Sequence, residues 1–139
     1  MSANTHLSIA SWNLALNAAL DTACNSGFLD IYDSTGTGQP ATPDVAVTTQ
    51  VKLASCALGS TALGAASAGT KTANAITNGT GLAVGTATWF RVYKSDHATA
   101  VIDGSVGTSA ADLIMADTAI TVSGVVPITS WTVSMPVGQ

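Results

Sequence analysis

Two histidines are the first side chains to consider for catalysis or metal binding in this 139-residue chain. His6 falls in a segment that we expect to be an N-terminal arm. His97 falls in Ser95-Asp96-His97-Ala98, which is typical of a hairpin tip. Neither belongs to an HExxH or similar metal-binding pattern. We therefore expect both to be solvated, and the sequence predicts no catalytic site, no metal site and no cofactor.

Paired carboxylates are the second possible source of chemistry, because glycoside hydrolases place two of them around the scissile bond. The nearest candidates are Asp30 with Asp33 and Asp103 with Asp112. Asp103 precedes Gly104, a dipeptide that favours a turn, and Asp112 stands where an Asx turn would cap a strand. These positions indicate structural roles, and we expect the protein not to be an enzyme.

Trp89, Arg91 and Tyr93 form the most distinctive side-chain pattern in the chain. In a strand they would share one face, with Thr88, Phe90 and Val92 on the other. An exposed face of this kind would place a cation between two aromatic rings, as a contact for a glycan or a partner protein. The pattern favours instead a central strand buried on both sides, with the Arg91 head group reaching the rim.

The remaining motifs indicate packing and turns. Cys24 and Cys56 lie far apart without CxxC or Cys/His spacing, which indicates buried free thiols, although pairing is not excluded. The loops Gly36-Thr37-Gly38 and Gly79-Thr80-Gly81 resemble phosphate cradles, but no Lys-Ser/Thr follows either of them.

Composition limits the classes of partner. Charged residues make up 9% of the chain, against about 25% in an average soluble protein, and the net charge is −4. A nucleic-acid-binding surface needs clustered Lys or Arg, so we expect no direct contact with nucleic acid. The apolar runs are too short for a membrane span, and no secretory signal is visible. A neutral, hydroxyl-rich surface is instead inexpensive to desolvate against another protein.

One helical segment is predicted, from about residue 12 to residue 24. Its apolar residues recur at helical spacing, Ser11 can cap its start and Asn25-Ser26-Gly27 can end it. The predicted organisation is an N-terminal arm of residues 1–10 followed by a single domain of residues 11–139. The region 59–85, which is poor in large apolar residues, is predicted to be rich in loops.

After this helix the hydrophobic period changes to two, which predicts a mainly β protein. Turn-forming residues separate the segments, and the stretch STGTGQPATPD reads as a surface loop. We expect an antiparallel β-sandwich, jelly-roll-like or Ig-like, or a barrel-like sheet. The predicted strands are 29–32, 45–54, 72–76, 86–94, 98–102, 119–126 and 128–135.

The order of four segments resembles a family of small proteins from the structural regions of tailed-bacteriophage genomes. These segments are FLDIYDSTGTGQPATPD, GTATWFRVYKSD, VIDGSVGTSAADLIM and ITSWTVSMP. The family carries a Y-D-G-x-Q-P-A loop, a G-T-A-T-W-F-R strand and a D-G-S-V-G-T-S-G-A-D-L turn. This chain departs from it by a longer loop at residues 34–38 and by Ala110-Ala111 in place of Gly-Ala. The resemblance spans residues 13–136 and implies a virion protein.

Size and surface favour a capsid decoration or cement protein, made in the bacterial host cytoplasm and placed on the capsid surface. Its expected partners are the major capsid protein and copies of itself. The alternatives are a tail or receptor-binding module that binds glycans, and a tail-tube or connector subunit. The segments expected to contact the capsid are the N-terminal arm and the loop of residues 34–44. Within them the contact residues would be Thr5, His6, Leu7, Gln39 and Pro40.

Overall fold

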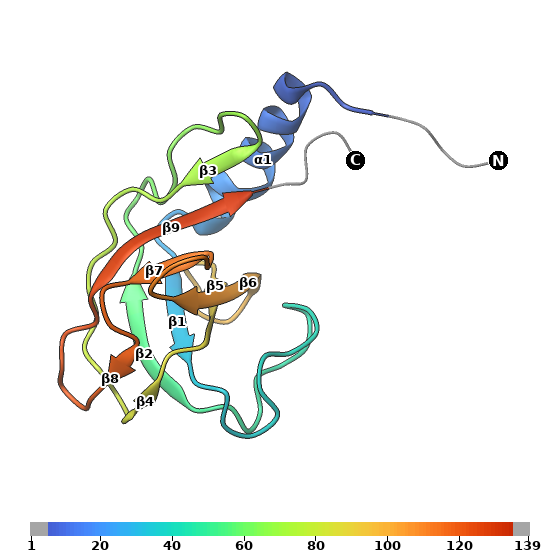
Figure 1. Ribbon diagram of the computed structural model, residues 1–139. Helices are drawn as coiled ribbons and strands as arrows, with labels where there is room; N and C mark the ends of the chain where they lie inside the picture. Colours follow the sequence, from blue (N-terminus) through green and yellow to red (C-terminus); the bar gives the residue numbers. More distant parts are fainter. Residues whose placement is uncertain (1–5, 135–139) are drawn as a thin grey trace.

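A computed structural model describes residues 6–134, and it confirms a mainly β protein with one helix near the N-terminus (Figure 1). The helix α1 covers Ile9–Cys24. The strands are β1 (Phe28–Tyr32), β2 (Lys52–Ala57), β3 (Thr70–Thr72), β4 (Gly85–Thr86), β5 (Trp89–Tyr93), β6 (Ala100–Gly107), β7 (Leu113–Met115), β8 (Ala119–Ile120) and β9 (Ile128–Ser134).

Helix α1 begins three residues earlier than predicted. Ser8 is its N-cap, in an extended conformation, and its hydroxyl accepts a hydrogen bond from the Ser11 N–H at 3.1 Å. The prediction that Ser11 caps the helix was therefore wrong, and the last two residues of the predicted arm belong to the helix. The buried face carries Leu16, Leu20 and Cys24. Leu16 and Leu20 belong to the face that the sequence predicted, whereas Ala19, which was also predicted on it, is exposed.

A polar stripe on α1 holds the loop-rich region in place. The side-chain oxygens of Asn13, Asn17 and Asn25 accept hydrogen bonds from the backbone N–H groups of Gly69, Ala66 and Ala62, at 2.9–3.0 Å. Between them Asp21 lies 2.6 Å from Nζ of the fully buried Lys71. The stripe repeats every four residues, which places these side chains along one side of the helix.

Seven strands form one sheet in the order β2-β1-β5-β6-β7-β9-β3, and β4 pairs with β8 in a separate ribbon. The strand pairs are antiparallel except for β6 and β7, which run parallel with Val106 opposite Leu113. The prediction of a purely antiparallel sheet was therefore wrong for the pair β6 and β7. The Asp112 carboxylate supports the short connection, because it accepts hydrogen bonds from the N–H and the hydroxyl of Ser105 at 3.0 Å.

The sheet curls into a barrel-like shape. In a flat sheet β5 and β9 would lie about 14 Å apart, three strand spacings, yet the rings of Phe90 and Trp131 meet edge to face at 5.7 Å. The segment 73–82 continues from β3, one edge strand of the sheet, and runs beside β9 and then beside the other edge strand, β2. It bonds to β9 through Ala73 N–H and Trp131 O at 2.8 Å, and to β2 through Leu82 N–H and Leu53 O at 2.7 Å.

Several strand boundaries differ from the prediction. The segment 45–51 is irregular, and β2 starts only at Lys52. The predicted turn at Asp103-Gly104 was wrong, since both residues lie inside β6. Strand β7 was missed, and the segment predicted as 119–126 shrinks to the two residues of β8. The predicted strand 72–76 lies instead at 70–72, as β3.

Gly104 lies in the middle of β6 because the adjacent strand leaves no room for a side chain. A Cβ atom at this position would lie 2.5 Å from the Phe90 ring. Phe90 itself is buried and in contact with Trp131, so its ring cannot easily move aside. The glycine therefore serves close packing, and the Asp-Gly pair does not form a turn.

The two cysteines are free thiols with no exposed surface, as the sequence indicated. Burial raises the pKa of Cys24 to about 11, and burial also raises the pKa of Cys56.

The thiolate is the species that reacts with a disulfide reagent such as DTNB. We therefore expect neither Cys24 nor Cys56 to react with this reagent in the folded protein at pH 8. Both should react within the mixing time in guanidinium chloride, and rapid reaction of the folded protein would contradict this.

Candidate functional site

The face of β5 that carries Trp89, Arg91 and Tyr93 is the centre of the candidate site. Trp89 is buried, stacks on Tyr32 at 4.4 Å and donates its indole N–H to the Asp33 carbonyl at 3.0 Å. Arg91 is also buried, with its guanidinium carbon 5.8 Å from the centre of the Trp89 ring. Tyr93 is half-buried. The three residues share a face as predicted, but two of them are covered and offer no open platform.

Arg91 is at the centre of a buried network. Its Nε and Nη2 donate to the two carboxylate oxygens of Asp103 at 2.6 and 2.8 Å. Its Nη1 donates to the Val45 carbonyl at 2.7 Å, and Nη2 also donates to the Thr42 carbonyl at 3.2 Å. The side chains of Arg91 and Asp103 are 2% and 5% exposed, so the expectation that the guanidinium reaches the rim was wrong.

This ion pair fixes the charge state of the network. The side-chain hydrogen bonds to Asp103 raise the pKa of Arg91 and outweigh the opposite effect of burial. A bidentate guanidinium–carboxylate pair is stronger and more directional than a single hydrogen bond. The remaining donors of the fork then hold two backbone carbonyls of a loop that is 46 residues away along the chain.

We call residues 34–50 the arginine-anchored loop. The loop is also tied internally, since Thr37 N–H donates to the Thr49 hydroxyl at 3.2 Å. Gln50 Nε2 donates to the Gly38 carbonyl at 2.6 Å and to the Thr37 hydroxyl at 2.9 Å. Gly36 has a φ of +75°, and a Cβ atom there would collide with Thr49. The loop is therefore ordered by its own chain.

The outer surface of the arginine-anchored loop is almost free of charge. Of the two predicted contact residues in the loop, Gln39 is exposed and Pro40 is half-buried. The loop contains no Lys or Arg, and Asp44 is its only charged residue. Such a surface loses little free energy when a protein partner removes its water.

A second polar cluster surrounds the buried Asp30 beside the loop. Lys52 Nζ lies 2.8 Å from one carboxylate oxygen, and His97 Nε2 lies 2.9 and 3.0 Å from the two oxygens. The His97 ring also stacks on Phe28 at 4.1 Å. His97 is indeed at a hairpin tip, with a φ of +54°, but the prediction of a fully solvated ring was wrong.

An open cavity of about 520 Å³ lies between this cluster and the arginine-anchored loop. Its wall includes Asp30, Lys52, Tyr93 and His97. Within this wall Asp30 pairs with both Lys52 and His97, which joins the hairpin tip to β1 and β2. Among residues 6–134, no three His, Cys, Asp or Glu side chains are grouped so that they could hold a metal ion.

The predicted contact residues of the arm lie elsewhere. Leu7 is exposed, and His6 is exposed next to it, whereas Thr5 lies outside the described residues. Figure 1 places the start of α1 and the arginine-anchored loop at opposite ends of the molecule. The structure therefore does not join residues 6–10, the described part of the arm, and the loop into one surface.

The site contains elements that the sequence analysis did not identify. The Asp30 cluster was missed, although a carboxylate between Leu29 and Ile31 in an apolar strand is a signal for a buried ion pair. The carbonyls of Thr42 and Val45 carried no such signal, because any residue can supply a carbonyl.

Within residues 6–134 no helix is both long and apolar enough to cross a bilayer. Comparison of the chain with protein-family models, with curated proteins and with solved structures gave no match.

Proposed function

We propose that this protein is a non-enzymatic structural protein of a tailed-phage virion, and that it decorates the capsid by binding the lattice of the major capsid protein. The observation that carries the proposal is the arginine-anchored loop, a nearly uncharged surface loop held by a buried ion pair. The resemblance of the sequence to small virion proteins supplies the setting, a virion, and the position on the outer surface of the head is inferred from the size and the surface of the protein.

Order in the loop favours binding because less entropy is lost on contact. A flexible contact segment would lose conformational freedom when it docks, at about 0.5–1.5 kcal/mol for each immobilised side chain. The loop of residues 34–44 was predicted as a contact segment because flexible segments often gain order against a neighbour. In the structure its own hydrogen bonds and Arg91 already order it.

The distribution of charge supports a role in assembly. Three of the four Lys and Arg side chains pair with carboxylates of the same chain, since Lys52, Lys71 and Arg91 lie 2.6–2.8 Å from Asp30, Asp21 and Asp103. Charged residues make up only 9% of the chain, so few charges lose their water when a partner binds. Many identical weak contacts on a repeating lattice then add up to strong retention.

The test is add-back of purified protein to virions that lack it. We expect these virions to release DNA at lower temperature, and the added protein to restore the wild-type temperature. Gln39→Glu places a charge on the exposed loop and should weaken binding to the capsid at least tenfold, which is about 1.4 kcal/mol. Thr108→Glu makes a matched change at an exposed residue outside the loop and should bind normally.

Three results would overturn the proposal. The first is unchanged heat resistance of virions without the protein. The second is equal capsid binding by the Gln39→Glu and wild-type proteins. The third is a position in the tail when intact virions are imaged by electron microscopy, which would favour the adhesin or tail-tube hypotheses instead.

A further inference from the structure

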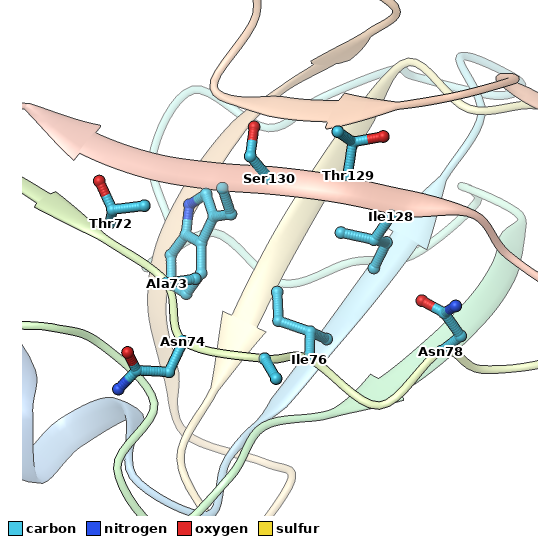
Figure 2. A pocket seen from close by; sticks show the side chains of 10 residues that line it. Thr72, Ala73, Asn74, Ile76, Asn78, Ile128, Thr129 and Ser130 are labelled. Carbon is cyan, nitrogen blue, oxygen red and sulfur yellow. The ribbon is translucent and has the colours of Figure 1, made fainter.

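A gap in the barrel wall lies between β9 and the segment 74–78 (Figure 2). Strands β3 and β9 are paired up to Thr72 and Thr132, and one more bond joins Ala73 N–H to the Trp131 carbonyl at 2.8 Å. Beyond this point the two segments separate, and no backbone hydrogen bond connects residues 74–78 with residues 128–130. The space between them is a cavity of about 420 Å³.

Both sides of the gap belong to the wall of the barrel. The other edge of β9 pairs with β7, where Ser130 lies opposite Ile114. The other edge of the segment faces β2, where Thr77 N–H donates to the Ala57 carbonyl at 3.2 Å. An additional strand in the gap would therefore continue the wall, which is the geometry of β-strand addition.

The lining of the gap indicates the chemistry of its occupant. Figure 2 shows the side chains of Ile76 and Ile128 in the space between the two segments. The other lining residues are hydroxyl, amide, alanine and indole groups, and none of them is charged: Thr72, Ala73, Asn74, Ala75, Asn78, Thr129, Ser130 and Trp131. A charged peptide would lose its hydration here without gaining an ion pair, so the occupant is uncharged and extended.

We propose that residues 1–5 of a second copy of this chain fill the gap as an added strand. The segment Met-Ser-Ala-Asn-Thr has no charged side chain and mostly small ones. As a strand it spans about 16 Å at about 3.3 Å per residue, which matches the five residues 74–78 on one side of the gap. The chain therefore contains a segment with the length and the charge that the gap requires.

The residues that follow this segment support contact between copies. Leu7, Ile9 and Leu14 are 47%, 53% and 70% exposed, so the start of α1 presents apolar side chains to water. Insertion of residues 1–5 into a neighbour would bring this apolar surface against that neighbour and cover it. The inference concerns contact between copies and does not depend on the proposed binding to the capsid.

The decisive experiment tests whether a disulfide can link two copies that carry different cysteine substitutions. One copy carries Ser2→Cys and the other carries Thr129→Cys, which lies at the gap. Because the native Cys24 and Cys56 have no exposed surface, they do not interfere. After mild oxidation we expect a disulfide-linked dimer in the mixed sample, at least ten times more abundant than in a mixture of Ser2→Cys with Thr108→Cys. Equal amounts of dimer in both mixtures would overturn the proposal.

A charge in the inserted segment gives an independent test. Ala3→Asp should weaken self-association, measured by sedimentation equilibrium, at least tenfold, whereas Thr108→Asp should leave it unchanged. At a concentration where both proteins are monomeric, the urea midpoint of the Ala3→Asp protein should equal that of the wild type, because the proposed contact is made only between copies.

Two outcomes would contradict the exchange between copies. A wild-type protein that stays monomeric at millimolar concentration would do so. So would a protein carrying both Ser2→Cys and Thr129→Cys that forms its disulfide only within one chain. Capsid binding is measured separately through Gln39→Glu, so a failure of either proposal can be distinguished from a failure of the other.

Discussion

Replacing Arg91 with alanine is expected to lower the free energy of unfolding by about 3–5 kcal/mol, because the carboxylate of Asp103 would remain buried without its partner. The loop carbonyls of Thr42 and Val45 would lose their donors at the same time. Urea unfolding at neutral pH measures the first effect. Faster cleavage by a protease within residues 34–50, while the rest of the chain stays intact, measures the second.

Two further variants separate charge from geometry. Arg91→Lys keeps the charge but has no planar fork, and we expect it to lose about 1–3 kcal/mol and part of the protection of the loop. Arg91→Met combined with Asp103→Leu removes both charges and should recover most of the stability without restoring the loop. If all variants protected the loop as the wild type does, Arg91 would not be its anchor.

Replacing Trp131 with alanine is expected to lower the free energy of unfolding by about 3–5 kcal/mol, because it leaves a cavity where β9 meets the core. Trp131 has no exposed surface and contacts Phe90 at 5.7 Å between ring centres. Thermal and urea unfolding of the variant provide the measurement.

The matched variant Trp131→Phe should cost much less. The indole N–H of Trp131 is buried without a hydrogen-bond partner, and an unsatisfied buried donor costs about 1–3 kcal/mol. Phenylalanine removes that donor while it keeps a ring against Phe90, so we expect a loss below about 1.5 kcal/mol. A loss as large as that of the alanine variant would show that the indole nitrogen has a stabilising contact.

Periodic patterns predicted the elements whose burial follows the pattern. The apolar spacing of Leu16 and Leu20 identified α1, and the alternation around Trp89 identified the shared face of β5. The start of α1 was missed because Ile9, in its first turn, is 53% exposed and adds nothing to the buried face. Ser8 and Ser11 are equally good caps by type, so composition alone did not distinguish them.

The errors arose where contacts distant in sequence override local preference. Asp103-Gly104 has the composition of a turn, but Asp103 pairs with Arg91 and Gly104 makes room for Phe90. The alternating segment 45–51 reads as a strand, but Arg91 holds the Val45 carbonyl. Neither partner can be identified from the local sequence.

The sequence predicted which residues share the face of the site, but it did not predict whether that face is exposed or covered. The sequence placed Trp89, Arg91 and Tyr93 on one face, and the structure agrees. Whether that face is open depends on the arginine-anchored loop, which covers it through two backbone carbonyls. The repeat of Asn13, Asn17, Asp21 and Asn25 was a visible signal that we did not use, and it accounts for the order of residues 62–71.

The position of β9 has a consequence for synthesis on the ribosome. This strand lies between β7 and β3, and it supplies the core with Trp131 and Val133. A nascent chain that has not reached residue 134 therefore lacks part of its core and leaves two neighbouring strands with unpaired edges. During translation such a chain is prone to aggregate. It can complete its native fold only after β9 has been synthesised.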